Sequence, residues 1–186
     1  DFDVPSVQSV HEHPRHFEIS TSQYANPANK GAFVNKLDFV ILAALEVDTD
    51  FNVNVITGSY GILRGAPGGH PDTSAGAKCT IIITPLVRGR MPTICERVVT
   101  VTTPGEVIDV VVTDYGIAVN PLRQDLVEAL SKTNLPIKTI EELKEEAYAI
   151  VGRPDDLKFH DRVVAILEAR DGTILDVVRQ LQETDI

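Results

Sequence analysis

Long apolar runs alternate with polar turns along this sequence. Residues 37–45 (LDFVILAAL) and 79–84 (CTIIIT) are nearly continuous apolar runs, the pattern of strands buried on both faces of a parallel sheet. Residues 52–57 alternate polar and apolar side chains. We therefore expect a half-buried strand there, with Asn52 and Asn54 on one side of it.

Helical periodicity dominates later in the chain. Residues 121–133 carry one apolar face with a 3.6-residue repeat, made of Leu122, Leu126, Val127 and Leu130. Thr139 and Glu142 form a capping-box pattern, which predicts a second helix that ends near Gly152. A shorter helix is expected over residues 29–35.

The remaining elements are shorter strands and a terminal hairpin. Short strands are expected at residues 16–20, 97–102 and 107–113, the last two joined by the turn Pro104-Gly105. Apolar runs at 163–167 and 174–181 flank Arg170-Asp171-Gly172, a strong hairpin signal. The expected fold is a single α/β domain over residues 1–186, with an open, largely parallel sheet flanked by helices and a C-terminal β-hairpin.

Composition and charge narrow the classes of partner. The net charge of −10 argues against nucleic acid, and no run of eighteen apolar residues is present to cross a membrane. Two cysteines are too few for a disulfide framework, so a reducing, cytoplasmic location is expected. The sequence has neither an initiator methionine nor a signal-peptide pattern, so we expect a piece of a longer chain.

The densest candidate for chemistry is the stretch 64–78, which holds four glycines and two prolines. A Gly68-Gly69 pair, with Gly65 before it, lets backbone approach a ligand closely, and N–H groups freed there can bind an oxygen. The alternative is a tight turn with no ligand. His70 could donate to a ligand or fix the turn.

A second candidate lies in residues 85–90 (PLVRGR), where Arg88 and Arg90 flank a glycine. Loops that follow strands of an open α/β sheet line its usual ligand crevice, and guanidinium groups there bind carboxylates or phosphates bidentately. The alternative is a pair of solvated surface charges. The histidines at 11, 13 and 16 are interpreted as a solvated loop, so no metal site is expected.

Several segments resemble a known superfamily. Residues 65–72 (GAPGGHPD) with 76–78 (GAK), and 112–118 (VTDYGIA), resemble the glycine loop and a V-T-[DE]-x-G-[VI]-A segment of coenzyme A transferases. More narrowly, the chain resembles the citrate lyase alpha subunit family over SQYANPANKGA (22–32), LEVDTDFNVNVITGS (45–59) and PLVRGRMP (85–92).

The resemblance implies a transferase that exchanges acetate for citrate on a thioester-bearing acyl carrier protein. The implied partners are the carrier (gamma) and lyase (beta) subunits of an oligomeric complex, together with citrate and acetate. No tightly bound cofactor is implied beyond the phosphopantetheine-type thioester on the carrier. The family has two similar α/β halves, of which this chain resembles the second.

The resemblance also suggests roles for the candidate residues. We expect backbone at Gly65, Gly68 and Gly69 to line the thioester arm. We expect Asn52 and Asn54 to bind acyl or substrate oxygens, Arg88 and Arg90 to neutralise carboxylates or phosphate, and His70 and Asp72 to order the loop.

No catalytic nucleophile is assigned, because no residue here matches the glutamate that many coenzyme A transferases use. A mixed anhydride of acyl and citrate carboxylates needs positioning and charge stabilisation instead. Two alternatives remain: a glutamate-dependent coenzyme A transferase or thioester hydrolase, and a non-catalytic subunit that only docks the carrier.

Overall fold

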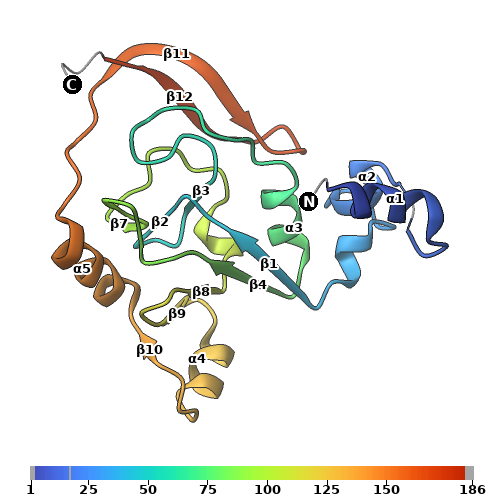
Figure 1. Ribbon diagram of the computed structural model, residues 1–186, viewed down its shortest axis with the longest axis horizontal. Coiled ribbons are helices and arrows are strands. Elements are labelled where there is room, and N and C mark those ends of the chain that lie inside the picture. Colours follow the sequence, from blue (N-terminus) through green and yellow to red (C-terminus); the bar gives the residue numbers. More distant parts are fainter. Residues whose placement is uncertain (1–2, 17, 183–186) are drawn as a thin grey trace.

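A five-stranded sheet forms the centre of the molecule (Figure 1). The computed structural model describes residues 3–16 and 18–182. The strand order is β1 (Phe39–Ala43), β4 (Cys79–Ile83), β8 (Val110–Val112), β9 (Ile117–Val119) and β10 (Ile137–Lys138). The pairs β1–β4, β4–β8 and β9–β10 are parallel, whereas β8–β9 is antiparallel. This arrangement confirms the predicted α/β fold with a largely parallel sheet.

One face of this sheet forms the core. Side chains of Leu42, Ile82, Val111 and Ala118 pack there against smaller strands and helix α5 (Ile140–Val151). The smaller sheets are β3-β2-β7 (Val53–Asn54, Glu46–Asp48, Ile94–Cys95) and the pair β5–β6 (Val87–Arg88, Met91–Pro92). Thr139 caps α5 as predicted: its hydroxyl accepts from Glu142 N at 3.1 Å, and the Glu142 carboxylate accepts from Thr139 N at 2.7 Å.

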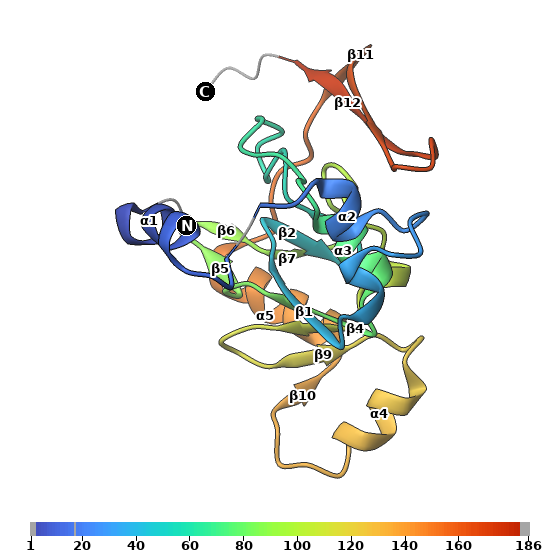
Figure 2. The same ribbon diagram turned by 90° about the vertical axis from the view of Figure 1, so that its right-hand side faces the viewer.

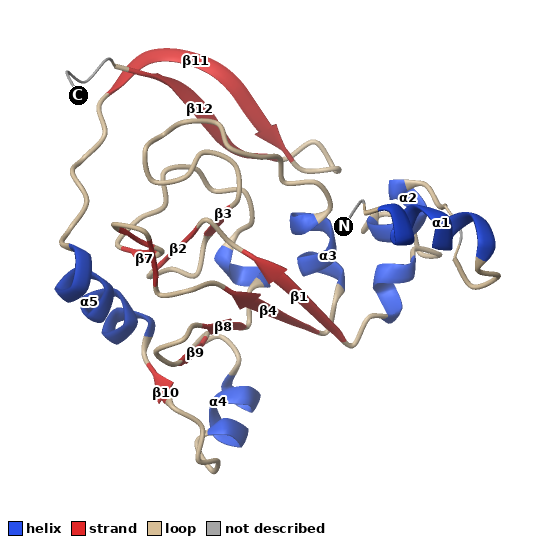
Figure 3. Ribbon diagram, in the orientation of Figure 1, coloured by secondary structure: helices blue, strands red, loops and turns tan. Residues whose placement is uncertain are grey.

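The described residues form four further helices, of which α3 lies beside β1 whereas α1, α2 and α4 lie towards the periphery of the molecule (Figure 3). They are α1 (Val4–Glu12), α2 (Thr21–Ala25), α3 (His70–Gly76) and α4 (Gln124–Leu130), with 3-10 turns at Phe33–Lys36 and Gly105–Val107. None of the helices formed by described residues is both long and apolar enough to span a membrane.

The predicted C-terminal hairpin is present as β11 (Phe159–Glu168) and β12 (Ile174–Leu181). Its turn places Gly172 at φ 91°, a conformation that favours glycine. Figure 2 shows this hairpin at one end of the molecule and α4 at the other. Among its contacts with the body are an ion pair between Arg170 and Asp72 and the hydrogen bond from Val101 N to Asp176 at 2.8 Å.

Two strand predictions are wrong. Residues 16 and 18–20 form no strand, and Phe17 lies outside the described residues. Residues 97–102 are irregular, because carboxylates occupy the backbone donors that a strand partner would use. The pairs are Val98 N to Asp48 (3.3 Å), Val99 N to Glu46 (3.3 Å) and Val101 N to Asp176.

Other elements are shorter or different from their predictions. The turn predicted at Pro104-Gly105 is a 3-10 helix in which Gly105 lies so close to Asp50 that a Cβ atom would be 1.9 Å from its carbonyl oxygen. The strand expected at 52–57 is reduced to β3, the helix expected at 29–35 to a 3-10 turn, and the helix expected at 121–133 to α4.

Candidate functional site

A crevice lies beyond the carboxyl ends of β1 and β4, where an open α/β sheet usually binds its ligand. Its cavity has a volume of about 270 Å³ and is lined by Leu45, Gly58, Ser59, Tyr60, Arg64, Arg88, Met91, Pro92 and Thr93. No acidic side chain is among these lining residues. Two guanidinium groups therefore set the charge of the crevice.

Arg88 is held in place by the strand ends themselves. Its Nη2 donates to the carbonyl oxygen of Ala44, just after β1, at 2.9 Å, and reaches Thr84 Oγ1, just after β4, at 3.5 Å. Within the described residues its Nε and Nη1 groups make no hydrogen bond, so part of the fork is free for an anion. Arg90 lies two residues further on, exposed in the β5–β6 turn and outside the cavity lining.

Arg64 is a site residue that the sequence analysis did not assign. Its backbone N–H donates to Ile56 O at 2.7 Å, which brings the start of the glycine loop beside the turn at Gly58. Its guanidinium group makes no hydrogen bond within the described residues, and it lines the same cavity as Arg88. The available signal was its position immediately before Gly65, at the entrance of the loop.

The three glycines follow Arg64 in the chain but do not line the cavity of the crevice. The structure requires glycine at two of these positions: Gly68 has φ 53°, and a Cβ on Gly65 would lie 3.0 Å from Val55 O. Gly69, the N-cap of α3, has φ −92° and room for a Cβ atom. Within the described part of the chain, the N–H groups of Gly68 and Gly69 donate no hydrogen bond, so they remain available to an acceptor.

His70 and Asp72 are buried and hold the loop in place. His70 Nε2 donates to Ala43 O at 3.1 Å because a carbonyl can only accept, and Nδ1 then accepts from the Thr103 hydroxyl at 2.7 Å. Burial lowers the pKa of His70, which favours this neutral form. Asp72 pairs with Arg170 of the hairpin turn. The geometry favours the ordering role expected for both residues.

The two asparagines are engaged within the protein. Asn54 is fully buried, donates to Glu46 at 2.8 Å and Thr57 at 3.0 Å, and accepts from the N–H groups of residues 56 and 57. Asn52 donates to Asp48 at 3.2 Å and accepts from Gly105 N at 2.9 Å. These bonds give both residues a structural role, and neither lines the basic cavity.

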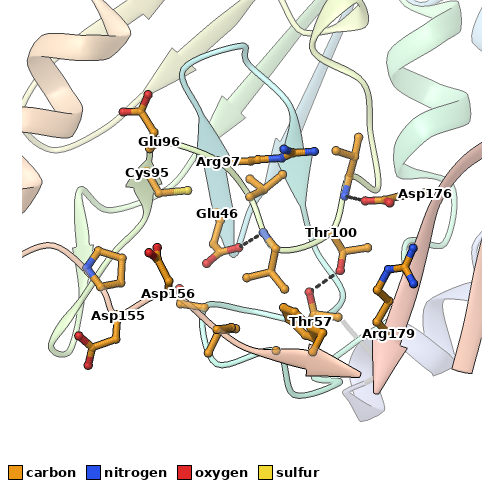
Figure 4. Close-up of a pocket in the computed structure, with 18 of the residues that line it drawn as sticks. Glu46, Thr57, Cys95, Glu96, Arg97, Thr100, Asp155, Asp156, Asp176 and Arg179 are labelled. Carbon is orange, nitrogen blue, oxygen red and sulfur yellow. Dashed lines mark hydrogen bonds between the residues drawn. The ribbon is translucent and has the colours of Figure 1, made fainter. Parts of the chain in front are cut away.

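A larger cavity of about 550 Å³ lies between the hairpin and the body (Figure 4). Its lining has more acidic than basic groups: Glu46, Glu96, Asp155, Asp156 and Asp176 against Arg97, Arg153 and Arg179. Cys95 also lines it, but burial raises the pKa of that thiol, so it stays protonated. Excess negative charge makes this cavity a poor site for a carboxylate ligand.

No metal centre is formed by the described residues, because none of their His, Cys, Asp and Glu side chains gather in a suitable group of three. The basic crevice therefore remains the best candidate site. It could bind a small anion by charge and by bidentate hydrogen bonds.

Comparisons with known proteins agree with one another. The family model of the citrate lyase alpha subunit matches residues 1–181. The citrate lyase alpha chains of Haemophilus influenzae and Klebsiella pneumoniae are each 54% identical to this chain, over 182 and 184 residues. These matches cover 98% and 99% of this chain but 36% of each relative, so the chain spans about a third of their length.

A solved structure is similar over the same extent. It is the putative alpha subunit of citrate lyase from Streptococcus mutans in complex with citrate, with a TM-score of 0.93 and 54% identity. The match covers 98% of this chain and 36% of that chain.

Proposed function

This chain belongs to the citrate lyase alpha subunit family, and we propose that its basic crevice binds citrate for transfer onto an acyl carrier protein. The observation that carries the proposal is the pairing of Arg64 and Arg88 in one small cavity without a carboxylate. Citrate presents three carboxylates, which two guanidinium forks can bind with parallel N–H donors. The citrate complex of the Streptococcus mutans protein supports the same ligand class.

The proposed reaction is an exchange on the thioester of the carrier. A citrate carboxylate oxygen attacks the acetyl carbonyl carbon, and the carrier thiolate leaves to give a mixed anhydride. The thiolate then attacks the citryl carbonyl carbon, and acetate leaves. No protein nucleophile is required, so the residues of this chain contribute by positioning and charge stabilisation.

In this proposal Arg64 and Arg88 hold the carboxylates of citrate. The N–H groups of Gly68 and Gly69, which donate no hydrogen bond within the described residues, are assigned to the oxygen of a phosphopantetheine-type thioester. The partners that complete the proposal are the acyl carrier and lyase subunits of a citrate lyase complex. The rest of a longer chain would supply the remaining site residues.

Two substitutions test this proposal, in the longer polypeptide assembled with its carrier. Arg88→Lys keeps the charge but loses the fork, so kcat/KM for citrate should fall roughly tenfold to a hundredfold. Arg90→Lys is the matched control, because Arg90 belongs to the same turn but does not line the cavity, and its kinetics should be unchanged. The assay is acetate–citrate exchange on the acetyl carrier, with citrate and carrier varied separately.

Each outcome has a distinct meaning. A defect confined to citrate assigns Arg88 to the tricarboxylate, whereas a defect confined to the carrier moves it to the phosphopantetheine side. Equal kinetics for both variants and the parent protein would place the site elsewhere. Loss of exchange in an Arg88→Lys protein that still assembles would exclude a subunit that only docks the carrier.

A further inference from the structure

The main sheet is apolar on the side opposite its core. The register β1–β4–β8–β9 places one set of side chains on this side, which we call the open face: Phe39, Ile41, Ala43, Cys79, Ile81, Ile83, Val110, Val112, Ile117 and Val119. No polar or charged side chain interrupts the set. Such a composition is that of a buried surface, because solvated sheet faces alternate with polar residues.

Exposure on the open face contradicts that composition. Phe39 is 67% exposed, Ile41 61% and Ile83 48%, while their neighbours Val40 and Ile82 are buried in the core on the other side. The runs 37–45 and 79–84 predicted strands buried on both faces, but the described residues cover the open face only in part. Cys79 and Val110 are buried there, whereas Phe39, Ile41 and Ile83 are exposed. The prediction of two-sided burial is therefore wrong at Phe39, Ile41 and Ile83, because no layer of described residues covers these side chains.

The β1 edge of the sheet has no second strand beside it within the described residues. β1 pairs with β4 on one side, and on this edge His70 of α3 contacts the carbonyl oxygen of Ala43. A hydrophobic edge strand is a site for pairing or aggregation unless another element covers it. Parallel sheets occur almost only with helices on both faces, so the same layer can protect the open face and the β1 edge.

We propose that the open face packs against amphipathic helices from a part of the polypeptide outside residues 1–186. The relatives provide the length for such a layer, since this chain spans 36% of each. A second copy of the chain is a less suitable occupant, because two chains of net charge −10 repel each other. This inference depends on family membership and not on the citrate chemistry proposed above.

Cysteine labelling of the longer polypeptide tests the proposal. Ile41→Cys reports on the open face, and Ile166→Cys is the matched control, since Ile166 is a β11 residue that is 60% exposed. The native cysteines Cys79 and Cys95 are buried, so their background is low. The rate at which each folded variant reacts with a water-soluble maleimide is divided by the rate of the same variant unfolded in denaturant. This ratio is the normalised labelling rate.

We expect Ile41→Cys to be labelled at least tenfold more slowly than Ile166→Cys, at every protein concentration. Equal normalised rates would overturn the proposal by showing a free face. Protection that disappears on dilution would also overturn it, in favour of a second copy. If Ile41→Cys does not fold, Ile83→Cys reports on the same face through β4 and is judged by the same criteria.

Discussion

Two groups of polar residues meet at the carboxyl ends of β1 and β4, and they differ in where their hydrogen bonds go. Asn54 and His70 are buried, and every polar atom of their side chains has a partner within the protein. Arg64 and Arg88 instead face a cavity, with donors left over. The first group holds the backbone, and the second group is available to a ligand.

The hydrogen-bond partners distinguish structural residues from residues that can bind a ligand, and the type of residue alone does not. Asn54 and Arg88 are both plausible ligands for an acyl oxygen, and both were expected to bind substrate. Only the hydrogen-bond partners show that Asn54 has no donor left, whereas Arg88 uses one amino group to attach itself to Ala44 O. Substitutions of the buried residues should therefore change the free energy of unfolding, whereas substitutions of the arginines should change the kinetics with citrate.

Asn54→Ala should give the largest effect on stability. It removes one of the two donors to the buried Glu46 carboxylate and leaves two backbone N–H groups without an acceptor, a cost of about 3 kcal/mol. Chemical denaturation measures the change. Asn35→Ala is the control, because its exposed amide makes a single bond to Asn29 O, and it should cost no more than about 1 kcal/mol. An equal loss of stability in Asn54→Ala and Asn35→Ala would contradict the structural role of Asn54.

His70 should give a pH-dependent effect. Its pKa is lowered by burial in the folded protein, so the unfolded protein binds a proton first as the pH falls. The stability contributed by neutral His70 is therefore present above the unfolded pKa, near 6.5, and is lost as the pH falls below it, by at most about 1.4 kcal/mol per pH unit.

The measurement compares the free energy of unfolding at several pH values between about 5 and 8. His70→Gln should lose this part of the pH dependence while keeping an amide that can bond Ala43 O and Thr103. An unchanged slope in the variant would show that His70 does not titrate across unfolding.

The glycine loop gives the smallest expected effect. Gly68→Ala should cost about 1 kcal/mol, because φ 53° is unfavourable for a residue with a Cβ although nothing lies within 4 Å of it. Gly69→Ala should change stability by less than about 0.5 kcal/mol, since its φ is −92° and its Cβ would make only ordinary contacts, the closest 3.6 Å from Tyr24. Thermal unfolding separates the two variants. A larger loss of stability in Gly69→Ala than in Gly68→Ala would mean that Gly69 is the constrained position.

Sequence patterns predicted the elements whose causes are local. The apolar runs gave β1 and β4, the Thr139–Glu142 capping box gave α5, and Asp171-Gly172 gave the hairpin. Each depends on residues that are neighbours in the chain. The irregular segment 97–102 was missed because its backbone donors bond carboxylates about fifty or more residues away, which no local pattern contains.

The candidate site was predictable only in outline. Arg88 was placed correctly near the strand ends, but the turn at Gly89 turns the chain so that Arg90 leaves the cavity. Arg64 joins the site through its backbone bond to Ile56 O, a contact made by folding of the loop. The roles of these residues in binding, and the place of this domain in a longer chain, stay predictions.

The ion pair between Asp72 and Arg170 joins residues 98 positions apart. At about 5–20 residues per second, a ribosome adds Arg170 roughly 5–20 s after Asp72. Until Arg170 has been added, helix α3, which follows the glycine loop, therefore lacks the cation that neutralises its buried carboxylate. The crevice end of the molecule should be among the last parts of this segment to acquire its final order on the ribosome.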